Sequence, residues 1–309
     1  MSLAEAKPAT TAVTAHFIDK GFHVFRDGVD KGAAARLLQT VKAERRFDGG
    51  LFLTEAEFDA DPQYTGVNPK PGRNLIERYE DLLAFVEADE GIVSGLTELL
   101  GERYDLLNKK FVCGVPRRWV PEWVRKRIAG NPVNNLGAYI RPDFRDVTYF
   151  YGIDFHQDLI DYRDREADFV TLYVYLHPVG RQDAPLFLLD GSHVLGGVMF
   201  PHDLERTGHE RWIYRDGFGR QAQVRQHLLI GDTGYAAMWH ACTLHGTQPD
   251  AADHERISLR YLFAKTTNVR TGIDRVNETL KGPISLSATR QDLAPDGSAI
   301  IKRNVVNGA

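Results

Sequence analysis

The chain has 309 residues, of which 43% are hydrophobic and 26% are charged, a composition that excludes disorder along the whole chain and is ample for a large folded core. The formal charge of −4 and the pI near 6.3 exclude a general binder of nucleic acids or anionic membranes, which needs a strongly positive surface. The two cysteines, Cys113 and Cys242, exclude a disulfide framework and a cysteine-rich metal cluster.

The same features indicate a compartment. Two cysteines fit a reducing environment, and residues 1–11 are polar and alanine-rich, without the apolar core of a signal peptide. The longest nearly apolar run, Phe169 to Leu176, is far shorter than the ~20 residues that span a bilayer. We therefore expect a cytoplasmic protein that does not associate with membranes.

The first third of the chain is predicted to be mostly helical. Lys31 to Arg46 and Glu77 to Leu100 carry apolar residues at helical intervals, and Gly101 is a suitable C-cap for the second helix. The Gly-, Asp- and Pro-rich stretch from Phe47 to Arg73 predicts a long loop between them. Residues 1–130 are thus expected to form a mostly helical part that packs on a later core.

After about Pro132 the pattern changes to short β-branched and aromatic segments with turn residues between many of them. The expected strands are Leu136–Arg141, Val170–His177, Leu186–Leu189, Val224–Leu229, Tyr235–Trp239 and Ile257–Ala264. Such a series predicts a mainly β fold of jelly-roll type with flanking helices. With no linker visible, we expect one domain over residues 1–309, with its core in 131–270 and a C-terminal extension in 271–309.

A candidate metal site begins at His156-Gln157-Asp158. On extended chain, residues two apart project to the same face, so an imidazole nitrogen and a carboxylate oxygen can reach one cation. His245 follows a strand-like segment and is the candidate third ligand. Two histidines and one carboxylate form a facial triad that leaves three positions open on Fe(II). A lone His-x-Asp is common by chance, so further residues are needed.

The further residues begin at Arg256, eleven positions after His245. Arg256, Ser258 and Arg260 share one face of an alternating strand. Without the triad, this would be read as the solvated face of a strand. With it, an arginine fork and a hydroxyl are well placed to hold a carboxylate.

Taken in order, these motifs resemble the phytanoyl-CoA dioxygenase-like family of Fe(II)/2-oxoglutarate oxygenases. The matching segments, which lie between Phe17 and Lys265, are Gly21–Phe25, His156–Leu159, Gly191–His193, Gly231-Asp232, His245–Thr247 and Arg256-x-Ser258. The combination is specific for the superfamily, fairly specific for the branch, and says little about substrate.

The resemblance implies a double-stranded β-helix with His156, Asp158 and His245 as ligands of Fe(II). It implies that Arg256 binds the distal carboxylate of 2-oxoglutarate, with Ser258 and Thr247 nearby. Since halogenating relatives carry Gly or Ala in place of the carboxylate, Asp158 favours a hydroxylase that uses O₂ and releases succinate and CO₂.

Some parts of the resemblance are structural. The turn at Gly191-Ser192-His193 looks like the family's structural turn. Asp183-Ala184 stands where the family often has Asn-Gly, a departure that we expect to matter little.

The substrate is expected to be a small polar metabolite or natural-product intermediate. Candidate substrate contacts are Arg260, which shares the inward face with Arg256, and Tyr139, Arg141 and Trp239. The stretch Trp212–Arg220 is a candidate lid. The competing interpretations are a cupin-like metal-dependent isomerase or hydrolase that uses the same triad without O₂, and a non-catalytic β-barrel binding protein in which the triad is accidental.

Overall fold

The computed structural model describes residues 12–61, 75–249, 252–294, 299–304 and 306. The amino-terminal stretch 1–11 and the second part of the predicted loop, 62–73, lie outside the described residues. Within the described ranges, no helix combines the length and the apolar character needed to cross a membrane.

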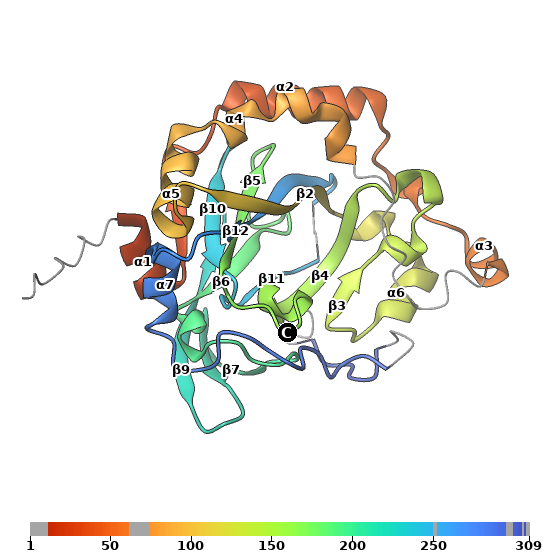
Figure 1. Ribbon diagram of the computed structural model, residues 1–309. Coiled ribbons are helices and arrows are strands. Elements are labelled where there is room, and N and C mark those ends of the chain that lie inside the picture. The colour runs from red at the N-terminus through yellow and green to blue at the C-terminus, as the bar shows by residue number, and fades with distance from the viewer. Residues whose placement is uncertain (1–11, 62–74, 250–251, 295–298, 305, 307–309) are drawn as a thin grey trace, which may run out of the picture.

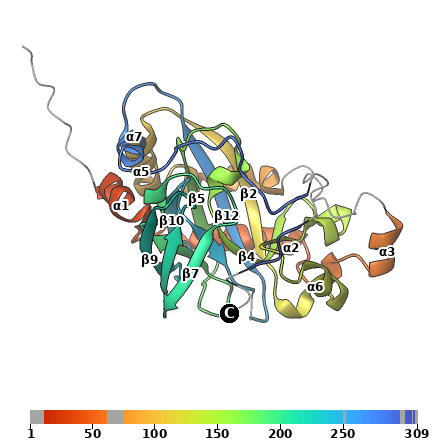
Figure 2. The same cartoon turned by 90° about the horizontal axis from the view of Figure 1, so that it is seen from below.

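Helices cover the outside of the molecule. The α-helices are α1 (Ala12–Lys20), α2 (Lys31–Glu44), α3 (Glu55–Ala60), α4 (Ala84–Glu87), α5 (Glu90–Leu100), α6 (Glu122–Ile128) and α7 (Gly272–Asn277). Short 3₁₀ turns are η1 (Gly49–Leu51), η3 (Leu75–Leu82), η4 (Arg117–Trp119), η5 (Gly137–Tyr139), η6 (Pro142–Phe144), η7 (Asp158–Asp161) and η8 (Ser192–Leu195). In both views α1, α5 and α7 lie together on one side, and α3 and α6 lie on the other (Figures 1 and 2).

The first predicted helix is present as α2, and the second is divided. The Asp30 side chain caps α2 by accepting from the Ala33 backbone N–H at 2.9 Å. The Asp89 side chain accepts from the Ile92 backbone N–H at 3.0 Å and caps α5. A new helix therefore begins within the range that was predicted as one continuous helix. Gly101 ends α5 with a φ of 94°, a left-handed value that glycine adopts without strain. A capping aspartate in a helical pattern therefore marks a break.

Twelve described strands form one sheet that folds around a pocket. They are β1 (Phe22–Phe25), β2 (Tyr104–Gly114), β3 (Val133–Asn135), β4 (Thr148–His156), β5 (Phe169–Tyr175), β6 (Leu186–Asp190), β7 (Asp203–Gly208), β8 (Arg211–Arg215), β9 (Gln221–Leu228), β10 (Ala236–His240), β11 (His245–Thr247) and β12 (Arg256–Lys265). Their order is β1-β10-β5-β12-β2-β4-β11-β6-β9-β8-β7, with β3 beside β4. Among the described strands, only β2 and β4 pair in parallel.

The strands β10, β5, β12 and β2 are consecutive in the sheet, and one of their faces packs against α2 and α5. On β5, Leu172 and Val174 pack outward into the core that includes Leu37 of α2 and Leu96 of α5. Tyr173, which alternates with them, faces inward with Trp239 of β10. Every residue of β5 is buried because both of its faces are covered, which explains its continuous apolar run.

The predicted mainly β architecture with flanking helices is confirmed, and five predicted strands correspond to β5, β6, β9, β10 and β12. The sixth is wrong: Leu136–Arg141 contains the 3₁₀ turn η5. The Asn135 side chain accepts from the Gly137 N–H at 3.1 Å and so stabilises a turn in place of a strand. The sheet also takes β1 and β2 from residues 1–130, the range expected to be mostly helical.

The candidate lid at Trp212–Arg220 does not lie over the pocket. It belongs to the β7–β8–β9 meander at one end of the sheet, and Trp212 packs against Phe155 with ring centroids 5.2 Å apart. None of its residues lines the pocket described below. Trp212 is therefore a core residue.

Candidate metal centre

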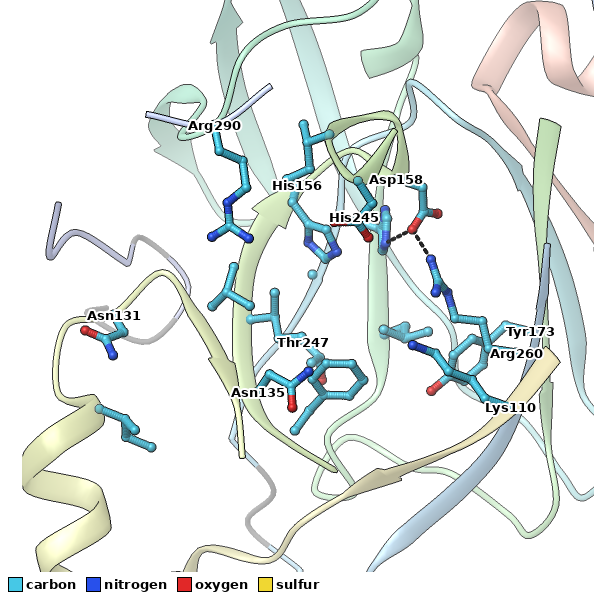
Figure 3. Close-up of a pocket in the computed structure, with 18 of the residues that line it drawn as sticks. Lys110, Asn131, Asn135, His156, Asp158, Tyr173, His245, Thr247, Arg260 and Arg290 are labelled. Carbon is cyan, nitrogen blue, oxygen red and sulfur yellow. Dashed lines mark hydrogen bonds and ion pairs between the residues drawn. The ribbon is translucent and has the colours of Figure 1, made fainter. Parts of the chain in front are cut away.

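A cavity of about 460 Å³ opens between the two halves of the folded sheet. This is within the range of roughly 300–1,000 Å³ that is usual for small-molecule sites. His156, Asp158 and His245 line it on one side (Figure 3). Each of the three offers one ligand atom, and these atoms lie within 4.8 Å of one another.

Neighbouring strands bring the three residues together. His156 ends β4, and the backbone register places it directly opposite His245, the first residue of β11. Asp158 follows in the turn η7, so the pair is not carried by extended chain alone, as the sequence interpretation assumed. The strand end and the turn together direct both side chains into the cavity (Figure 3).

Backbone carbonyls set the orientation of both imidazoles. His156 Nδ1 lies 2.9 Å from the Asp154 carbonyl, and His245 Nδ1 lies 3.1 Å from the Thr243 carbonyl. A carbonyl only accepts, so each Nδ1 carries the proton and donates it. Both Nε2 atoms are then left as lone-pair donors facing the cavity, which is the tautomer that a metal requires.

Asp158 is fixed by hydrogen bonds to one of its oxygens. Oδ2 accepts from Thr171 Oγ1 at 2.6 Å and from Trp239 Nε1 at 2.9 Å. The other oxygen, Oδ1, faces His245 Nε2 at 3.7 Å and accepts from Arg260 Nη2 (Figure 3). With an exposed fraction of 1%, this carboxylate depends on its partners for its charge.

Burial and the neighbouring charges set the protonation states. Burial alone would raise the pKa of Asp158, but Arg260, His245 and His156 more than offset it and hold the pKa below its usual range. Burial, followed by the neighbouring His156, lowers the pKa of His245 to about 3. Burial likewise lowers the pKa of His156. At neutral pH the site therefore presents an anionic carboxylate and two neutral imidazoles.

This donor set fits a divalent transition metal. Two imidazole nitrogens and one carboxylate oxygen are the ligands of a non-haem Fe(II) facial site. The three ligand atoms lie within 4.8 Å of one another. They must move closer together to reach metal–ligand distances of about 2.0–2.2 Å, and small side-chain rotations can supply this movement. Asp158 Oδ1 is the oxygen directed at His245, and it would be shared between a metal and Arg260.

The motif residue between the ligands has a structural role that sequence reasoning missed. Gln157 is fully buried and donates from Nε2 to the carbonyls of Gly196 and Cys242, each at 2.8 Å, while its Oε1 accepts from Val198 N–H at 2.9 Å. It thereby ties η7 to the loop before β11. In the predicted structural turn, Ser192 Oγ accepts from Leu244 N–H at 2.9 Å, which supports the same loop.

The predicted 2-oxoglutarate residues lie at different depths. Arg256 lines the cavity with an exposed fraction of 1% and donates to the Ala184 carbonyl and, at 3.3 Å, to the Tyr173 hydroxyl. Thr247 also lines the cavity and donates to the same carbonyl at 3.0 Å. Ser258 is fully buried beneath the wall, and its Oγ has no hydrogen-bond partner among the described residues.

The four substrate candidates separate clearly. Arg260, Tyr139 and Trp239 line the cavity, although Arg260 and Trp239 both bind Asp158. Arg141 does not line it: its guanidinium pairs with Glu57 at 2.8 and 3.1 Å on the surface. The expectation for Arg141 depended on the strand that proved to be the turn η5, and this turn directs it outward.

Sequence reasoning missed several lining residues, which include Lys110, Asn131, Asn135, Tyr173 and Arg290. Lys110 sits directly opposite Arg260 in the β2–β12 pairing. Burial, followed by repulsion from Arg260, lowers its pKa to about 8. The alternation of β2, with Lys110 two residues before the buried Val112, was a signal that could have placed it inside.

Comparisons with known proteins bear on the fold and on part of the chain. No family model matches. Over 113 residues the chain is 29% identical to a probable alpha-ketoglutarate-dependent hypophosphite dioxygenase of Stutzerimonas stutzeri, a match that spans 36% of this chain and 38% of that protein. The matched part is thus well under half the length of this relative.

Solved structures match over most of the chain. The epimerase SnoN, in complex with Fe3+, alpha ketoglutarate and nogalamycin RO, aligns with a TM-score of 0.50 and 15% identity over 94% of this chain and 92% of that one. EctD from S. alaskensis, in its apoform, aligns with a TM-score of 0.48 and 13% identity over 94% and 90%. The alignment with SnoN confirms the predicted jelly-roll core as a fold.

Proposed function

We propose that this chain is an Fe(II)- and 2-oxoglutarate-dependent dioxygenase of the phytanoyl-CoA dioxygenase-like type, working as one domain in the cytoplasm. The observation that carries the proposal is the convergence of His156, Asp158 and His245, within 4.8 Å, on a cavity that Arg256 also lines. The partial match to a probable alpha-ketoglutarate-dependent dioxygenase supports it from an independent direction.

The three ligand residues would hold Fe(II), which together with 2-oxoglutarate supplies the activation of O₂ and the oxidation of a substrate C–H bond. The protein's own residues prepare this. Asp154 and Thr243 fix the tautomers of the two histidines, and Trp239 and Thr171 hold one carboxylate oxygen so that the other faces the metal position.

The cosubstrate side of the cavity is assigned to Arg256 and Thr247. Arg256 would take the distal carboxylate of 2-oxoglutarate, because its planar fork lines the cavity and its guanidinium carbon lies 5.7 Å from the centre of the Tyr173 ring. Thr247 shares the Ala184 carbonyl with it and lies close by. Ser258 lies two residues after Arg256 on β12. Its buried hydroxyl has no partner among the described residues and could donate a hydrogen bond to the cosubstrate.

The reaction that we assign is hydroxylation of a small polar metabolite or natural-product intermediate, with release of succinate and CO₂. Asp158 would fill with a carboxylate the position that a halide takes in halogenating relatives. A cupin-like isomerase or hydrolase would use the same three ligands without needing a buried arginine beside them.

The test is anaerobic addition of Fe(II) and then 2-oxoglutarate to the full chain, followed by visible spectroscopy. A new charge-transfer band that requires both additions is expected, because the metal must be chelated by the keto acid. His245→Ala should abolish the band. The matched control His254→Ala removes a half-exposed histidine outside the cavity and should retain it.

A second measurement separates the oxygenase from its alternatives. With O₂ admitted, a screen of small polar substrates should show one that accelerates succinate formation. Absence of the band in the wild-type protein, or substrate turnover that is independent of O₂, would refute the proposal and favour the isomerase or hydrolase.

A further inference from the structure

The cavity has a second wall, across from Arg256 and Arg260, that the metal and cosubstrate do not use. Arg290, Asn131 and Asn135 line it (Figure 3), and so does Leu293, which follows Arg290 in the C-terminal extension. We propose that Arg290, oriented by Asp292, binds an oxyanionic group of the primary substrate, so that the substrate is a small acid carrying a carboxylate or a phosphorus oxyanion. This inference rests on the proposed function and specifies its substrate class.

The backbone around Arg290 is fixed to the core of the fold. Phe200 N–H donates to the Thr289 carbonyl at 2.9 Å, and Gln291 N–H donates to the Phe200 carbonyl at 3.0 Å. Arg290 lies between these two bonds, with its guanidinium carbon 5.3 Å from the centre of the Phe200 ring. The side chain is thus set on an anchored segment of the C-terminal extension.

A buried carboxylate orients the guanidinium. Nε and Nη2 of Arg290 donate to the two oxygens of Asp292, at 3.0 and 2.7 Å. Asp292 is only 1% exposed, whereas the Arg290 side chain is 24% exposed, so the carboxylate of this two-pronged pair is buried and the guanidinium stays accessible. Nη1 has no hydrogen-bond partner within the described part of the chain, and Figure 3 shows the guanidinium turned into the cavity. A preformed donor of this kind loses little freedom when it binds an anion.

The charges of the residues that line the cavity favour an anionic ligand. The cations Lys110, Arg256, Arg260 and Arg290 line it, against the carboxylates Asp158 and Asp161. A divalent metal and the 2-oxoglutarate dianion compensate one another. Among the described residues that line the cavity, positive charge remains in excess by one, even with Asp292 counted behind Arg290. A substrate that carries a negative charge would complement this excess.

Two amides extend the same wall. The Asn135 Oδ1 atom already accepts from Gly137 N–H, which leaves its NH₂ group as a donor. Asn131 Oδ1 is buried and has no partner among the described residues. Asn304 Nδ2 donates to the carbonyls of Asn131 and Pro132 at 3.1 and 3.2 Å, so the end of the chain holds this loop in place. The NH₂ group of Asn135 therefore offers this wall a donor for an acidic substrate, whereas Asn131 Oδ1 offers an acceptor.

The test uses the full chain saturated with Ni(II) and 2-oxoglutarate, a combination chosen to hold the metal site without turnover. Acetate and inorganic phosphate serve as oxyanion probes in calorimetric titrations at fixed ionic strength. Arg290→Gln should weaken binding of the better probe roughly tenfold to a hundredfold, the loss expected for a hydrogen bond to a charged group. The affinity for 2-oxoglutarate, which depends on the other wall, should stay as in the wild type.

The matched control is Arg303→Gln. It removes the same charge from the same extension, but Arg303 donates to the Leu204 carbonyl at 3.4 Å and does not line the cavity. Its probe affinity should equal that of the wild type. Should Arg290→Gln alone unfold because Asp292 is left buried and unpaired, the double variant Arg290→Gln/Asp292→Asn replaces it in the comparison.

Wild-type affinity in Arg290→Gln, or equal losses in Arg290→Gln and Arg303→Gln, would overturn the inference. Repeating the titration on metal-free protein separates this failure from that of the proposed function. Arg290-dependent probe binding without any binding of Ni(II) and 2-oxoglutarate would refute the oxygenase and leave the anion subsite standing.

Discussion

The two walls of the cavity are built in different ways. The metal and cosubstrate wall comes from paired strands, where His245 faces His156 across β11 and β4, and Arg260 faces Lys110 across β12 and β2. The opposite wall comes from the short strand β3, the turn η5, the loop at Asn131 and the C-terminal extension. Isolated hydrogen bonds tie the extension to the Asn131 loop, and one ion pair lies within the extension.

This difference separates chemistry from specificity. Strand pairing fixes side chains on a rigid frame, as a metal site requires. Turns and terminal segments change without disturbing the sheet, so they are suited to recognising a particular substrate. Changes in the strand wall should therefore affect metal and cosubstrate first, and changes in the other wall should affect only the primary substrate.

The largest effect is expected from Asp158→Ala. It removes a proposed metal ligand and leaves Arg260 without its carboxylate partner in a largely buried position. We expect complete loss of the Fe(II)/2-oxoglutarate band, and a fall of about 3–5 kcal/mol in the unfolding free energy of the metal-free protein. Denaturant titration measures the second effect.

A double variant separates these two consequences. Asp158→Ala/Arg260→Met removes both charges and should recover most of the lost stability without restoring the band. An unaltered band in either variant would show that Asp158 is not a ligand.

Next in size is Arg256→Ala. Removing one partner of a buried, hydrogen-bonded charge pair costs roughly 2–5 kcal/mol, so the affinity for 2-oxoglutarate should fall on the order of thirtyfold to several thousandfold. An anaerobic titration of the charge-transfer band measures it.

Arg260→Ala is the companion variant. Arg260 lowers the pKa of Asp158, so without it the carboxylate should protonate, and release metal, at a higher pH than in the wild type. Metal binding followed from pH 7 downward should show this shift, with a smaller change in 2-oxoglutarate affinity than in Arg256→Ala. Equal losses of 2-oxoglutarate affinity in both variants would assign both arginines to the cosubstrate.

A smaller effect should come from Lys110. Its pKa of about 8 means that its charge is present below pH 8 and is lost as the pH rises through that value. Affinity for the anionic 2-oxoglutarate should therefore fall by about tenfold, or ~1.4 kcal/mol, as the pH rises from 7 to 9.5. Lys110→Met should bind more weakly at pH 7 and lose this dependence. A wild-type profile that is flat over this range would contradict the prediction.

The sequence predicted the strand wall far better than the other one. Alternation placed Arg256 and Arg260 inward, which follows from the two-residue period of a strand. The His156-x-Asp158 spacing indicated one site even though Asp158 lies in the turn η7, and His245 was found by its place after a strand-like segment. Arg290 lies 34 residues beyond Arg256 in an extension with no regular period. No local pattern announces that its neighbour Asp292 is buried or that Phe200 anchors it, since both depend on distant contacts.

The wrong strand prediction for Leu136–Arg141 shows that an apolar and aromatic pattern does not by itself identify a strand. Leu136–Arg141 carries apolar and aromatic residues typical of a strand, yet the Asn135 side chain and Gly137 form a turn. One consequence is that Tyr139 lines the cavity while Arg141, two residues on, does not. On a strand these two would have shared a face.

The smallest effect is therefore expected from Arg141→Ala, which tests the boundary of the second wall. Its pair with Glu57 is exposed, and exposed pairs contribute little, so binding of 2-oxoglutarate and of the oxyanion probes should equal that of the wild type. The Arg141 hydrogen bond is the main cause that lowers the pKa of Glu57 to about 2, and the variant should return this pKa toward its ordinary value.

A carboxylate with a lowered pKa stabilises the fold above its ordinary pKa and loses that contribution as the pH falls toward 2. Any difference in thermal midpoint between the wild type and Arg141→Ala should thus be largest at neutral pH and become smaller in acid. NMR titration of the Glu57 carboxyl measures the pKa directly. A loss of probe binding in Arg141→Ala that matches the loss in Arg290→Gln would mean that the substrate wall extends around η5 to the outer surface.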